Sequence, residues 1–482
     1  MNQSFLKSLQ RIVGQGGFVI DQGERLTYEC DALSHLREVP GAVVLPDTAE
    51  QIQKVVALCN REHVPFVTRG AGTGLSGGAR PLADGLLIVT TRLNDILDID
   101  IPNQRITVEP GVSNLEVSRQ VAIHGFYYAP DPSSQQICSI GGNIAENSGG
   151  AHCLKYGFTS HHVLSVEAVL PNGKVVQIDG PALDAPGLDL LGVLIGSEGT
   201  LAIVTKATLR LLRIPEATQT VLAAFNSTDA AAEVVSGIIR EGIIPAAVEM
   251  MDRLTIEAAE AAVHPGFPDA EAILIVELDG PLVEVESLMQ RVEQICYQND
   301  VQSLQRAQDE VERARFWKGR KAAFAAMGRV APSYYVQDGV VPRTRLPEVL
   351  GKIRRLEADS GLRIGNVFHA GDGNLHPLIC YDSNLEGQAE LAERVATEIL
   401  TYCIEAGGSI TGEHGVGVDK VKHLPKMFND DDLDSMQRVR CAFDPKGLCN
   451  PGKIFPTPRL CGEIPGPYRE HPAERTGQAE RF

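Results

Sequence analysis

The chain has 482 residues, of which 43% are hydrophobic and 22% are charged, and its formal net charge at pH 7 is −18. A chain of this length is too long for one hydrophobic core, so we expect two or three domains. The excess of acidic residues argues against nucleic acid or an anionic membrane surface as the main partner. Because no run of about 18 apolar residues occurs, we expect no transmembrane segment.

The N-terminal segment and the cysteines bear on the location of the protein. Residues 1–17 carry apolar side chains at helical spacing, with Lys7 and Arg11 among them, and lack the continuous apolar stretch of a secretory signal. Ten cysteines are scattered without a C-x-x-C pair, so the chain offers no iron–sulfur cluster of its own. We expect reduced, mostly buried thiols and a cytoplasmic protein.

The first half alternates between helix and strand patterns. One helix is expected at about 47–60, where Asp47 and Glu50 resemble a capping box, and another at about 113–125. Short or alternating apolar runs predict strands at 64–68, 85–90, 105–108, 163–170, 174–178 and 200–212. Over the first 125 residues this alternation is typical of α/β organisation.

Beyond Pro215, which we take as a domain boundary, the pattern changes. Strands are expected near 219–225, 245–250, 272–278, 365–368 and 375–381. Helices are expected near 228–241, 282–298, 308–328 and 386–406. This order predicts an α+β or ferredoxin-like arrangement. The tail from Leu460 is rich in Pro, Gly, Glu and Arg, and we expect it to be loosely ordered.

The stretch Arg69–Gly78 reads R-G-A-G-T-G-L-S-G-G, and five of the nine residues from 70 to 78 are glycine. Such a loop leaves its backbone N–H groups open to close approach and forms a concavity suited to an anion, most often a phosphate. A glycine-rich surface turn is the alternative. Two further glycine-rich zones, 130–157 and 192–199, follow within 130 residues and favour a binding role. The zone 130–157 shows little regular pattern, which is unusual in a compact domain unless it binds something.

The loop also contains G-x-G-x-x-G at Gly72–Gly77, with Asp98 about 20 residues on, as in the nicotinamide-dinucleotide fingerprint. That fingerprint requires a helix that begins inside the motif and meets the pyrophosphate. Here Pro81 and Asp84-Gly85 break the chain, and a new strand begins. We therefore expect a phosphate-binding loop of a different fold.

A second constellation is Asn366–His376, N-V-F-H-A-G-D-G-N-L-H, in which His369 and His376 flank a tight turn. Gly412-Glu413-His414-Gly415 follows further on. Two histidines and a glutamate form a common ligand set for a divalent metal with an open position. The alternative is that the histidines simply bond to backbone around the turn. The set suits zinc, manganese or iron, and the sequence does not choose among them.

The three glycine-rich loops resemble those of flavoproteins with a para-cresol methylhydroxylase-type (vanillyl-alcohol oxidase) FAD domain, from Val43 to about Leu212. The second half resembles the C-terminal domain of the FAD-linked D-2-hydroxyacid dehydrogenases. Its motifs are H-A-G-D-G-N-x-H, G-E-H-G and F-D-P-x-G-x-x-N-P-G-K at Phe443–Lys453. Within that family, Phe316–Lys321 and Tyr334–Pro342 resemble the glycolate oxidase FAD subunits most closely.

The resemblance implies bound FAD. Some relatives attach the flavin covalently through a histidine in the first loop; this loop has none, so dissociable FAD is expected, although His152 lies in the second zone. The residues that the resemblance assigns to FAD are Arg69, Gly70, Ala71, Gly72, Thr73, Gly74, Gly77, Gly78, Pro130, Asp131, Ser139, Gly141, Gly142, Asn143, Asn147, Gly149, Gly150, Tyr156, Gly157, Ser197, Glu198, Gly199 and Ile203.

The resemblance also implies the chemistry. The residues that it would assign to the metal are His369, His376 and Glu413, with Asn374 and Arg320 on the substrate and His414 as the base. A metal on the substrate hydroxyl lowers the pKa of that hydroxyl, so an imidazole can remove its proton while a hydride passes to flavin N5. An arginine fork would hold the carboxylate. From spacing alone, the favoured interpretation of Arg320 is a solvated helix cation among other basic residues, Arg313, Arg315, Lys318 and Lys321.

The implied fold is α+β. An N-terminal helical segment (1–36) precedes a two-part FAD-binding domain (37–215), followed by a ferredoxin-like substrate and metal domain with a C-terminal helical segment (216–457) and a tail (458–482). The implied reaction is oxidation of a small D-2-hydroxy acid to the 2-oxo acid. Glycolate, oxidised to glyoxylate, is the first candidate for the substrate, and D-lactate and D-2-hydroxyglutarate are the alternatives. More distant alternatives are a non-redox flavin transferase and a non-catalytic flavin subunit.

The resemblance further implies a partner subunit. The sequence shows no haem motif, no cluster motif and no nicotinamide site, so reduced FAD needs an external electron acceptor. The resemblance implies that this acceptor is an iron–sulfur subunit, which passes the electrons to a quinone. Such a partner would bring a cytoplasmic chain to the membrane periphery.

Overall fold

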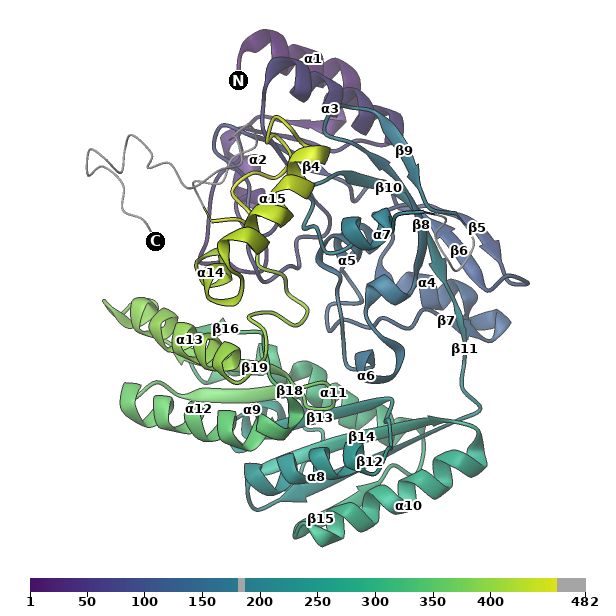
Figure 1. Ribbon diagram of the computed structural model, residues 1–482, viewed down its shortest axis with the longest axis vertical. Coiled ribbons are helices and arrows are strands. Elements are labelled where there is room, and N and C mark those ends of the chain that lie inside the picture. The colour runs from purple at the N-terminus through teal and green to yellow at the C-terminus, as the bar shows by residue number, and fades with distance from the viewer. Residues whose placement is uncertain (181–186, 457–482) are drawn as a thin grey trace.

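The computed structural model describes residues 1–180 and 187–456. A four-stranded sheet in the order β1-β2-β4-β3 lies at the N-terminal end of the molecule (Figure 1). Its strands are β1 (Phe18–Val19), β2 (Ala42–Val44), β3 (Phe66–Arg69) and β4 (Leu86–Val89), and its helices are α1 (Gln3–Val13), α2 (Gln22–Arg25) and α3 (Ala49–Glu62). Phe5 and Leu9 of α1 recur every turn and are buried in one core with Ile52 and Val55 of α3. The expected N-terminal helix is thereby confirmed.

A five-stranded antiparallel sheet in the order β5-β6-β10-β8-β9 follows. Its strands are β5 (Ile96–Asp100), β6 (Arg105–Val108), β8 (Val163–Val169), β9 (Val175–Ile178) and β10 (Ile203–Arg210). The strictly alternating burial along β10 places its apolar side chains in one core with those of β6 and β8. The other elements of this part are α4 (Asn114–Val121), β7 (Phe126–Tyr127), α5 (Ile140–Glu146), α6 (Cys153–Tyr156), α7 (Leu190–Leu194) and β11 (Leu212–Arg213). The strands predicted at 163–170 and 174–178 are confirmed as β8 and β9, which pair as an antiparallel hairpin.

The second half is built on one antiparallel sheet in the order β15-β12-β14-β13-β18-β19-β16, with β17 paired to β19. The strands are β12 (Ala217–Phe225), β13 (Ala247–Asp252), β14 (Ala272–Gly280), β15 (Val301–Arg306), β16 (Ser333–Val336), β17 (Gly339–Val340), β18 (Ile364–His369) and β19 (Asn374–Tyr381). The first four strands stand in the ferredoxin-like order, fourth, first, third, second. The predicted α+β class is confirmed.

Helices cover both faces of this sheet. One face shares a core with α8 (Thr228–Arg240), α10 (Leu282–Gln298), α12 (Leu346–Ser360) and α13 (Gln388–Glu405). The other face shares a core with α9 (Arg253–Val263) and α11 (Glu310–Ala326). Short 3₁₀ turns connect elements at Gln15–Gly17, Leu26–Tyr28, Ala122–His124, Thr159–His161, Met327–Arg329, Arg343–Arg345 and Val421–His423. Glu249, His369 and His376 belong to the α9–α11 face, because strand neighbours of the same register point to the same side.

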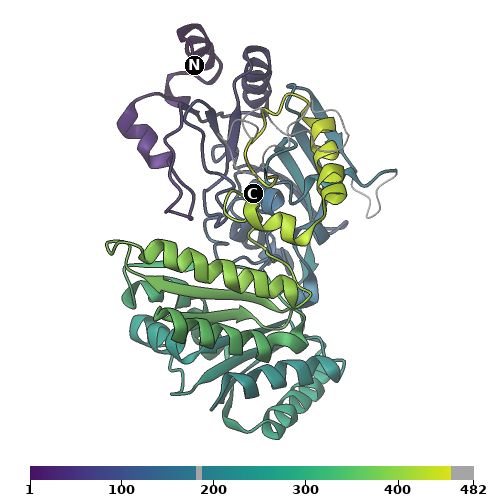
Figure 2. The same ribbon diagram turned by 60° about the vertical axis from the view of Figure 1, so that its left-hand side comes forward.

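The C-terminal segment returns to the first half, as the yellow ribbon in Figures 1 and 2 shows. It contains α14 (Leu424–Met427) and α15 (Asp430–Phe443). Cys449 forms a parallel bridge with Phe66 of β3. The Asn450 side-chain amide donates to the carbonyl oxygens of Gly78 (3.0 Å) and Glu198 (2.7 Å), so one residue joins the first and third glycine-rich loops.

Two local expectations were wrong. The N-cap of α3 is Thr48, whose hydroxyl accepts the N–H of Gln51 at 3.2 Å, while Asp47 pairs with Arg92. The zone 130–157 holds α5 and α6, because the Ser139 hydroxyl caps α5 and its apolar residues one turn apart are buried. Its glycines hid this pattern. The predicted tail from Leu460 lies outside the described residues.

Candidate active site

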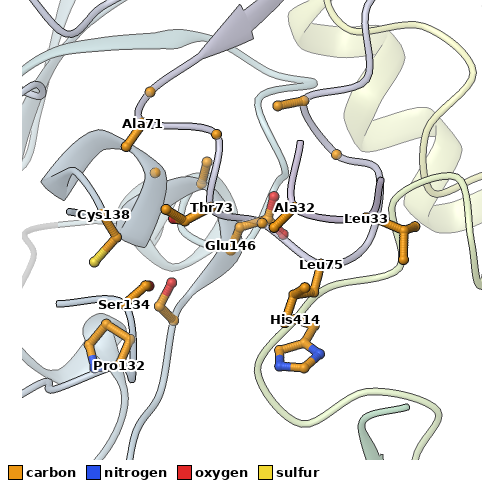
Figure 3. A pocket seen from close by; sticks show the side chains of 18 of the residues that line it. Ala32, Leu33, Ala71, Thr73, Leu75, Pro132, Ser134, Cys138, Glu146 and His414 are labelled. Atoms are coloured by element: carbon orange, nitrogen blue, oxygen red, sulfur yellow. The ribbon is translucent and has the colours of Figure 1, made fainter. Parts of the chain in front are cut away.

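A cavity of about 930 Å³ lies where the glycine-rich loops of the first half meet the second half of the chain. Figure 3 shows Thr73 of the first loop, Cys138 of the second zone and His414 around this space. The residues assigned to FAD from the sequence that line it are Gly70, Ala71, Gly72, Thr73, Gly74, Gly78, Ser139, Gly141, Gly142, Asn143, Ser197, Glu198, Gly199 and Ile203. Three loops that are distant in sequence therefore form one site.

The first loop connects two parallel strands, β3 and β4, and none of residues 70–85, all of which are described, is helical. The loop therefore differs from a nicotinamide-dinucleotide fingerprint, as the sequence predicted. Its glycines permit close packing: a Cβ on Gly70 would collide with the Ser139 hydroxyl, and Gly72 has a positive φ of 74°. The first loop is thus seated directly on the N-terminus of α5.

The third loop connects the cavity to the segment that follows His414. The Glu198 carboxylate accepts the backbone N–H groups of Val416 (2.6 Å) and Gly417 (2.7 Å). Glu146, at the end of α5, also lines the cavity and packs beside Gly415. Burial, with the neighbouring Glu198 charge, raises the pKa of Glu146 well above its ordinary value. Sequence reasoning missed Glu146, a lone acid in a glycine-rich run.

Other residues assigned to FAD do not line the cavity. Among the described residues, those outside its lining are Arg69, Gly77, Pro130, Asp131, Asn147, Gly149, Gly150, Tyr156 and Gly157. Arg69 donates to the carbonyl oxygen of Cys30, and the Tyr156 hydroxyl donates to Asp279 at 2.6 Å. A Cβ on Gly149 would meet a carboxylate oxygen of Glu413 at 2.8 Å, so this glycine allows the two halves to approach.

His152 is held between two carboxylates. Its Nδ1 lies 2.8 Å from Asp131 and its Nε2 lies 3.1 Å from Glu277 on β14. Although burial opposes the charge, the two carboxylates raise the pKa of His152 to about 10. His152 is therefore a charged link between the second glycine-rich zone and the sheet of the second half, with both ring nitrogens engaged.

The predicted histidine hairpin forms as expected. His369 ends β18 and stands opposite Asn374, and His376 follows two residues later on β19. The Glu413 Oε1 lies 3.3 Å from Nε2 of His369 and 3.3 Å from Nε2 of His376. These three ligand atoms lie within 4.8 Å of one another, so the structure brings together the three residues predicted as metal ligands.

The donor set fits a divalent cation. Neither ring nitrogen of His376 makes a hydrogen bond within the described part of the chain, although both are buried. Burial disfavours the charge of Glu413, but the neighbouring histidines lower the pKa of its carboxyl to about 2. Two imidazoles and a carboxylate around a common point are a typical set of ligands for zinc, manganese or iron.

His414 lies between this cluster and the cavity. Its ring stacks on His376 with centroids 5.0 Å apart, and it lines the cavity. Burial is the main cause that lowers the pKa of His414 to about 4; the charge of Asp338 opposes this shift, and the charge of Lys420 adds to it. The imidazole is thus neutral near pH 7 and can accept a proton.

Asp338 holds the loop that carries Glu413 and His414. Its buried carboxylate accepts the backbone N–H of Gly412 (3.0 Å) and of His414 (2.9 Å), and it pairs with Lys420 at 3.2 Å. Sequence reasoning cited Asp338 only as part of the stretch Tyr334–Pro342. A single acidic residue in that apolar stretch was the signal that could have found it.

Arg320 is buried, and the alternative of a solvated helix cation is wrong. Only 2% of the residue is exposed, and its Nε donates to Glu249 at 2.6 Å. It does not line the cavity, but its guanidinium lies 5.8 Å from the ring of Phe324, which does. Among the described residues, Nη2 of Arg320 and Oδ1 of Asn374 are buried without a hydrogen-bond partner. Both side chains thus retain unused polar atoms.

Two family profiles match the chain. Residues 40–179 match the FAD binding domain, and residues 214–454 match the C-terminal domain of FAD linked oxidases. The chain therefore belongs to the FAD-linked oxidases, and it is a flavoprotein oxidoreductase.

The curated relatives match almost the whole chain. The chain is 50% identical over 460 residues to the glycolate oxidase subunit GlcD of Escherichia coli (strain K12), covering 95% of this chain and 92% of that protein. Identity is 40% to the glycolate oxidase subunit GlcD of Bacillus subtilis (strain 168), covering 93% of this chain and 96% of the relative. The chain is 32% identical to the mitochondrial D-lactate dehydrogenase [cytochrome] of Arabidopsis thaliana, and the match covers 88% of this chain and 74% of that protein.

Solved structures share the fold. p-Cresol methylhydroxylase with bound substrate superposes with a TM-score of 0.80 at 15% identity, covering 94% of this chain and 96% of that chain. An alkyldihydroxyacetonephosphate synthase superposes with a TM-score of 0.75 at 19% identity, covering 94% and 86%. At such low identity the likeness shows the fold alone, and it confirms the predicted para-cresol methylhydroxylase-type FAD-binding fold.

Proposed function

We propose that this chain oxidises a small 2-hydroxy acid, glycolate, to the corresponding 2-oxo acid, glyoxylate. The observation that carries the proposal is the position of His414, which touches both the FAD cavity and the cluster of His369, His376 and Glu413. The two GlcD relatives, whose printed name is glycolate oxidase subunit, support glycolate as the substrate.

In this proposal the three clustered residues hold a divalent metal. Bound there, the metal would supply a Lewis acid that lowers the pKa of the substrate hydroxyl, and bound FAD would supply the electron acceptor. The three ligand atoms converge on one point. The two ring nitrogens of His376, which are buried and make no hydrogen bond in the described part of the chain, support this assignment.

His414 acts as the base. Its imidazole is neutral at pH 7 and takes the hydroxyl proton, while Asp338 fixes the position of its backbone. Arg320 binds the substrate carboxylate through the unused Nη2, and Asn374 contributes its unused Oδ1 to a polar group of the substrate. The three loops hold FAD without a covalent bond, with contacts from the residues named above as lining the cavity.

Turnover would require a separate iron–sulfur subunit as the electron acceptor, with a quinone as the final acceptor. The word subunit in the names of the GlcD relatives supports a partner. No helix in the described part of the chain has the length and apolar character to cross a bilayer. The protein would be cytoplasmic and would reach the membrane through this partner. If the purified chain alone turned over with a quinone as fast as a cell extract does, this result would contradict the proposal that a partner subunit is needed.

The deciding experiment is anaerobic reduction of the bound FAD by substrate. The loss of the visible absorbance of the flavin measures this reduction. Glycolate, D-lactate, L-lactate and D-2-hydroxyglutarate are added in separate experiments. We expect bleaching with glycolate, slower bleaching with D-lactate and none with L-lactate. The absence of bleaching with every 2-hydroxy acid would overturn the proposed oxidation.

D-Lactate is the second candidate substrate, because the Arabidopsis relative is named a D-lactate dehydrogenase. Faster bleaching with D-lactate than with glycolate would favour it. A non-redox flavin transferase has support only from fold, through the alkyldihydroxyacetonephosphate synthase structure. The convergence of His369, His376, Glu413 and His414 argues against it and against a non-catalytic flavin subunit.

A further inference from the structure

Glu249 connects two groups that the proposed function uses separately. Its Oε1 lies 2.8 Å from Nδ1 of His369, and its Oε2 accepts from Nε of Arg320 at 2.6 Å. Glu249 is 1% exposed, and the side chains of His369 and Arg320 are 5% and 3% exposed. A single buried carboxylate therefore bridges a metal-ligand candidate and the candidate for carboxylate recognition.

The backbone around Glu249 is hydrogen-bonded to a neighbouring strand on each side. The residue lies in β13, which is paired on one side to β14 and on the other to β18, and its direct neighbours are Ile275 and His369. Directly opposed residues of an antiparallel pair point to the same side of the sheet. Glu249 and His369 therefore meet as cross-strand neighbours, while Arg320 reaches them from α11 on the covering layer.

The two contacts orient both partners. A histidine that donates its Nδ1–H to a carboxylate presents the Nε2 lone pair as a ligand, and here Nε2 faces Glu413 at 3.3 Å. An arginine whose Nε is engaged keeps its outer nitrogens for another anion, and Nη2 of Arg320 is buried without a partner among the described residues.

We propose that Glu249 is a positioning residue that fixes the separation between the metal ligand His369 and the guanidinium of Arg320. In a 2-hydroxy acid the hydroxyl and the carboxylate are on adjacent carbon atoms, so both can be held only at one spacing. Glu249 thereby selects 2-hydroxy acids over 3-hydroxy acids. This inference rests on the proposed function, since it needs a metal at His369.

Glu277 supplies a matched control. It is also 1% exposed, lies on the neighbouring strand β14, and likewise pairs with a histidine, His152, and an arginine, Arg313. It contacts none of the three metal-ligand candidates by hydrogen bond or ion pair. Glu277→Gln therefore disturbs a comparable buried network of the same sheet and leaves the Glu249 contacts in place.

The first measurement is metal affinity. Holoenzyme with bound FAD is stripped with EDTA and titrated with Zn²⁺ or Mn²⁺ in a calorimeter. Glu249→Gln should raise the metal Kd about 10- to 100-fold, as losing the carboxylate behind a histidine ligand typically does. Glu277→Gln should stay near the wild-type value. Equal Kd values for wild type and Glu249→Gln, or equal weakening in both variants, would overturn the inference.

The second measurement is specificity. The ratio of kcat/KM for glycolate to that for 3-hydroxypropanoate should fall at least about 10-fold in metal-saturated Glu249→Gln, because a displacement near 1 Å costs that much or more. A purely structural role would lower both values together and leave the ratio unchanged, and that result would contradict the inference.

Glu249→Asp covers the case in which Glu249→Gln does not fold. It keeps the charge and withdraws the carboxylate by one methylene, so it can reach one partner but not both. A drop in either metal affinity or the glycolate preference is expected, and wild-type values for both would overturn the inference. Wild-type holoenzyme that binds no metal would instead reject the proposed function, so the two failures are distinct.

Discussion

The carboxylate of Asp338 accepts the backbone N–H of His414 at 2.9 Å and lies 3.9 Å from Nδ1 of the same residue. One aspartate thus fixes the backbone of the proposed base and also lies near its ring. It also neutralises Lys420, which is only 1% exposed.

Asp338→Asn should destabilise the protein. The substitution leaves Lys420 buried without its counter-charge, and breaking a buried pair in this way costs about 3–5 kcal/mol. The free energy of unfolding in urea measures the loss. Asp359→Asn, at an exposed position of α12, is the control and should change little. A change below about 1 kcal/mol in Asp338→Asn would show that Asp338 is not the anchor of this loop.

His414→Ala should spare FAD binding and slow reduction by glycolate. General-base catalysis by a positioned side chain contributes about 10²- to 10⁴-fold, so a loss in that range is expected. Anaerobic stopped-flow absorbance measures the reduction rate, and FAD content is measured on the same sample. His124→Ala, at an exposed position, is the control. A variant that reduces its flavin at the wild-type rate would exclude His414 as the base.

Gly70→Ala should weaken FAD binding. The added Cβ would collide with the Ser139 hydroxyl and push the first loop away from α5. Overpacking of this kind costs about 1–3 kcal/mol, which corresponds to at least a roughly fivefold rise in the FAD Kd. Fluorescence titration of apoprotein with FAD gives the value. Gly16→Ala, where a Cβ meets nothing within 4 Å, should bind FAD like wild type.

His152 makes the stability depend on pH. Its pKa is about 10 in the folded protein, against about 6.5 in an unfolded chain, because Asp131 and Glu277 hold its charge despite burial. The stabilisation that charged His152 gives to the folded protein is therefore complete below pH ~6.5, and it is lost as the pH rises toward 10. Between pH 6 and 9, wild type should lose roughly 3 kcal/mol more unfolding free energy than His152→Gln. Identical pH profiles would contradict a charged His152. His124→Gln should follow wild type.

Regular periodicity explains which parts of the fold were predictable. The helix Leu282–Gln298 and the strand Arg105–Val108 have the bounds that the sequence predicts, because their apolar residues recur at helix or strand spacing. The approach of His369 and His376 was also predictable, since a tight turn between two histidines can place both on one face of a hairpin. The glycine-rich loops were found through their composition.

Long-range contacts explain what the sequence could not give. Glu249 and Arg320 are 71 residues apart, and only the sheet and α11 bring them together. Arg320 alone reads as a solvated cation because its neighbours on α11 are charged. Asp338 holds the backbone of Gly412 and His414, which are 74 and 76 residues away, and Glu146 packs beside Gly415, which is still more distant from it in sequence. The glycines of α5 similarly made this helix hard to predict from its sequence, although Ser139 caps its N-terminus.

The most direct test of the proposed chemistry is metal removal and return, followed by flavin reduction. Holoenzyme is treated with EDTA, metal loss is confirmed by elemental analysis, and reduction by glycolate is recorded anaerobically before and after Zn²⁺, Mn²⁺ or Fe²⁺ is added. We predict that FAD stays bound, that reduction slows at least about 100-fold without metal, and that one of the three ions restores it. Reduction at the full rate by protein that has lost its metal would contradict the account.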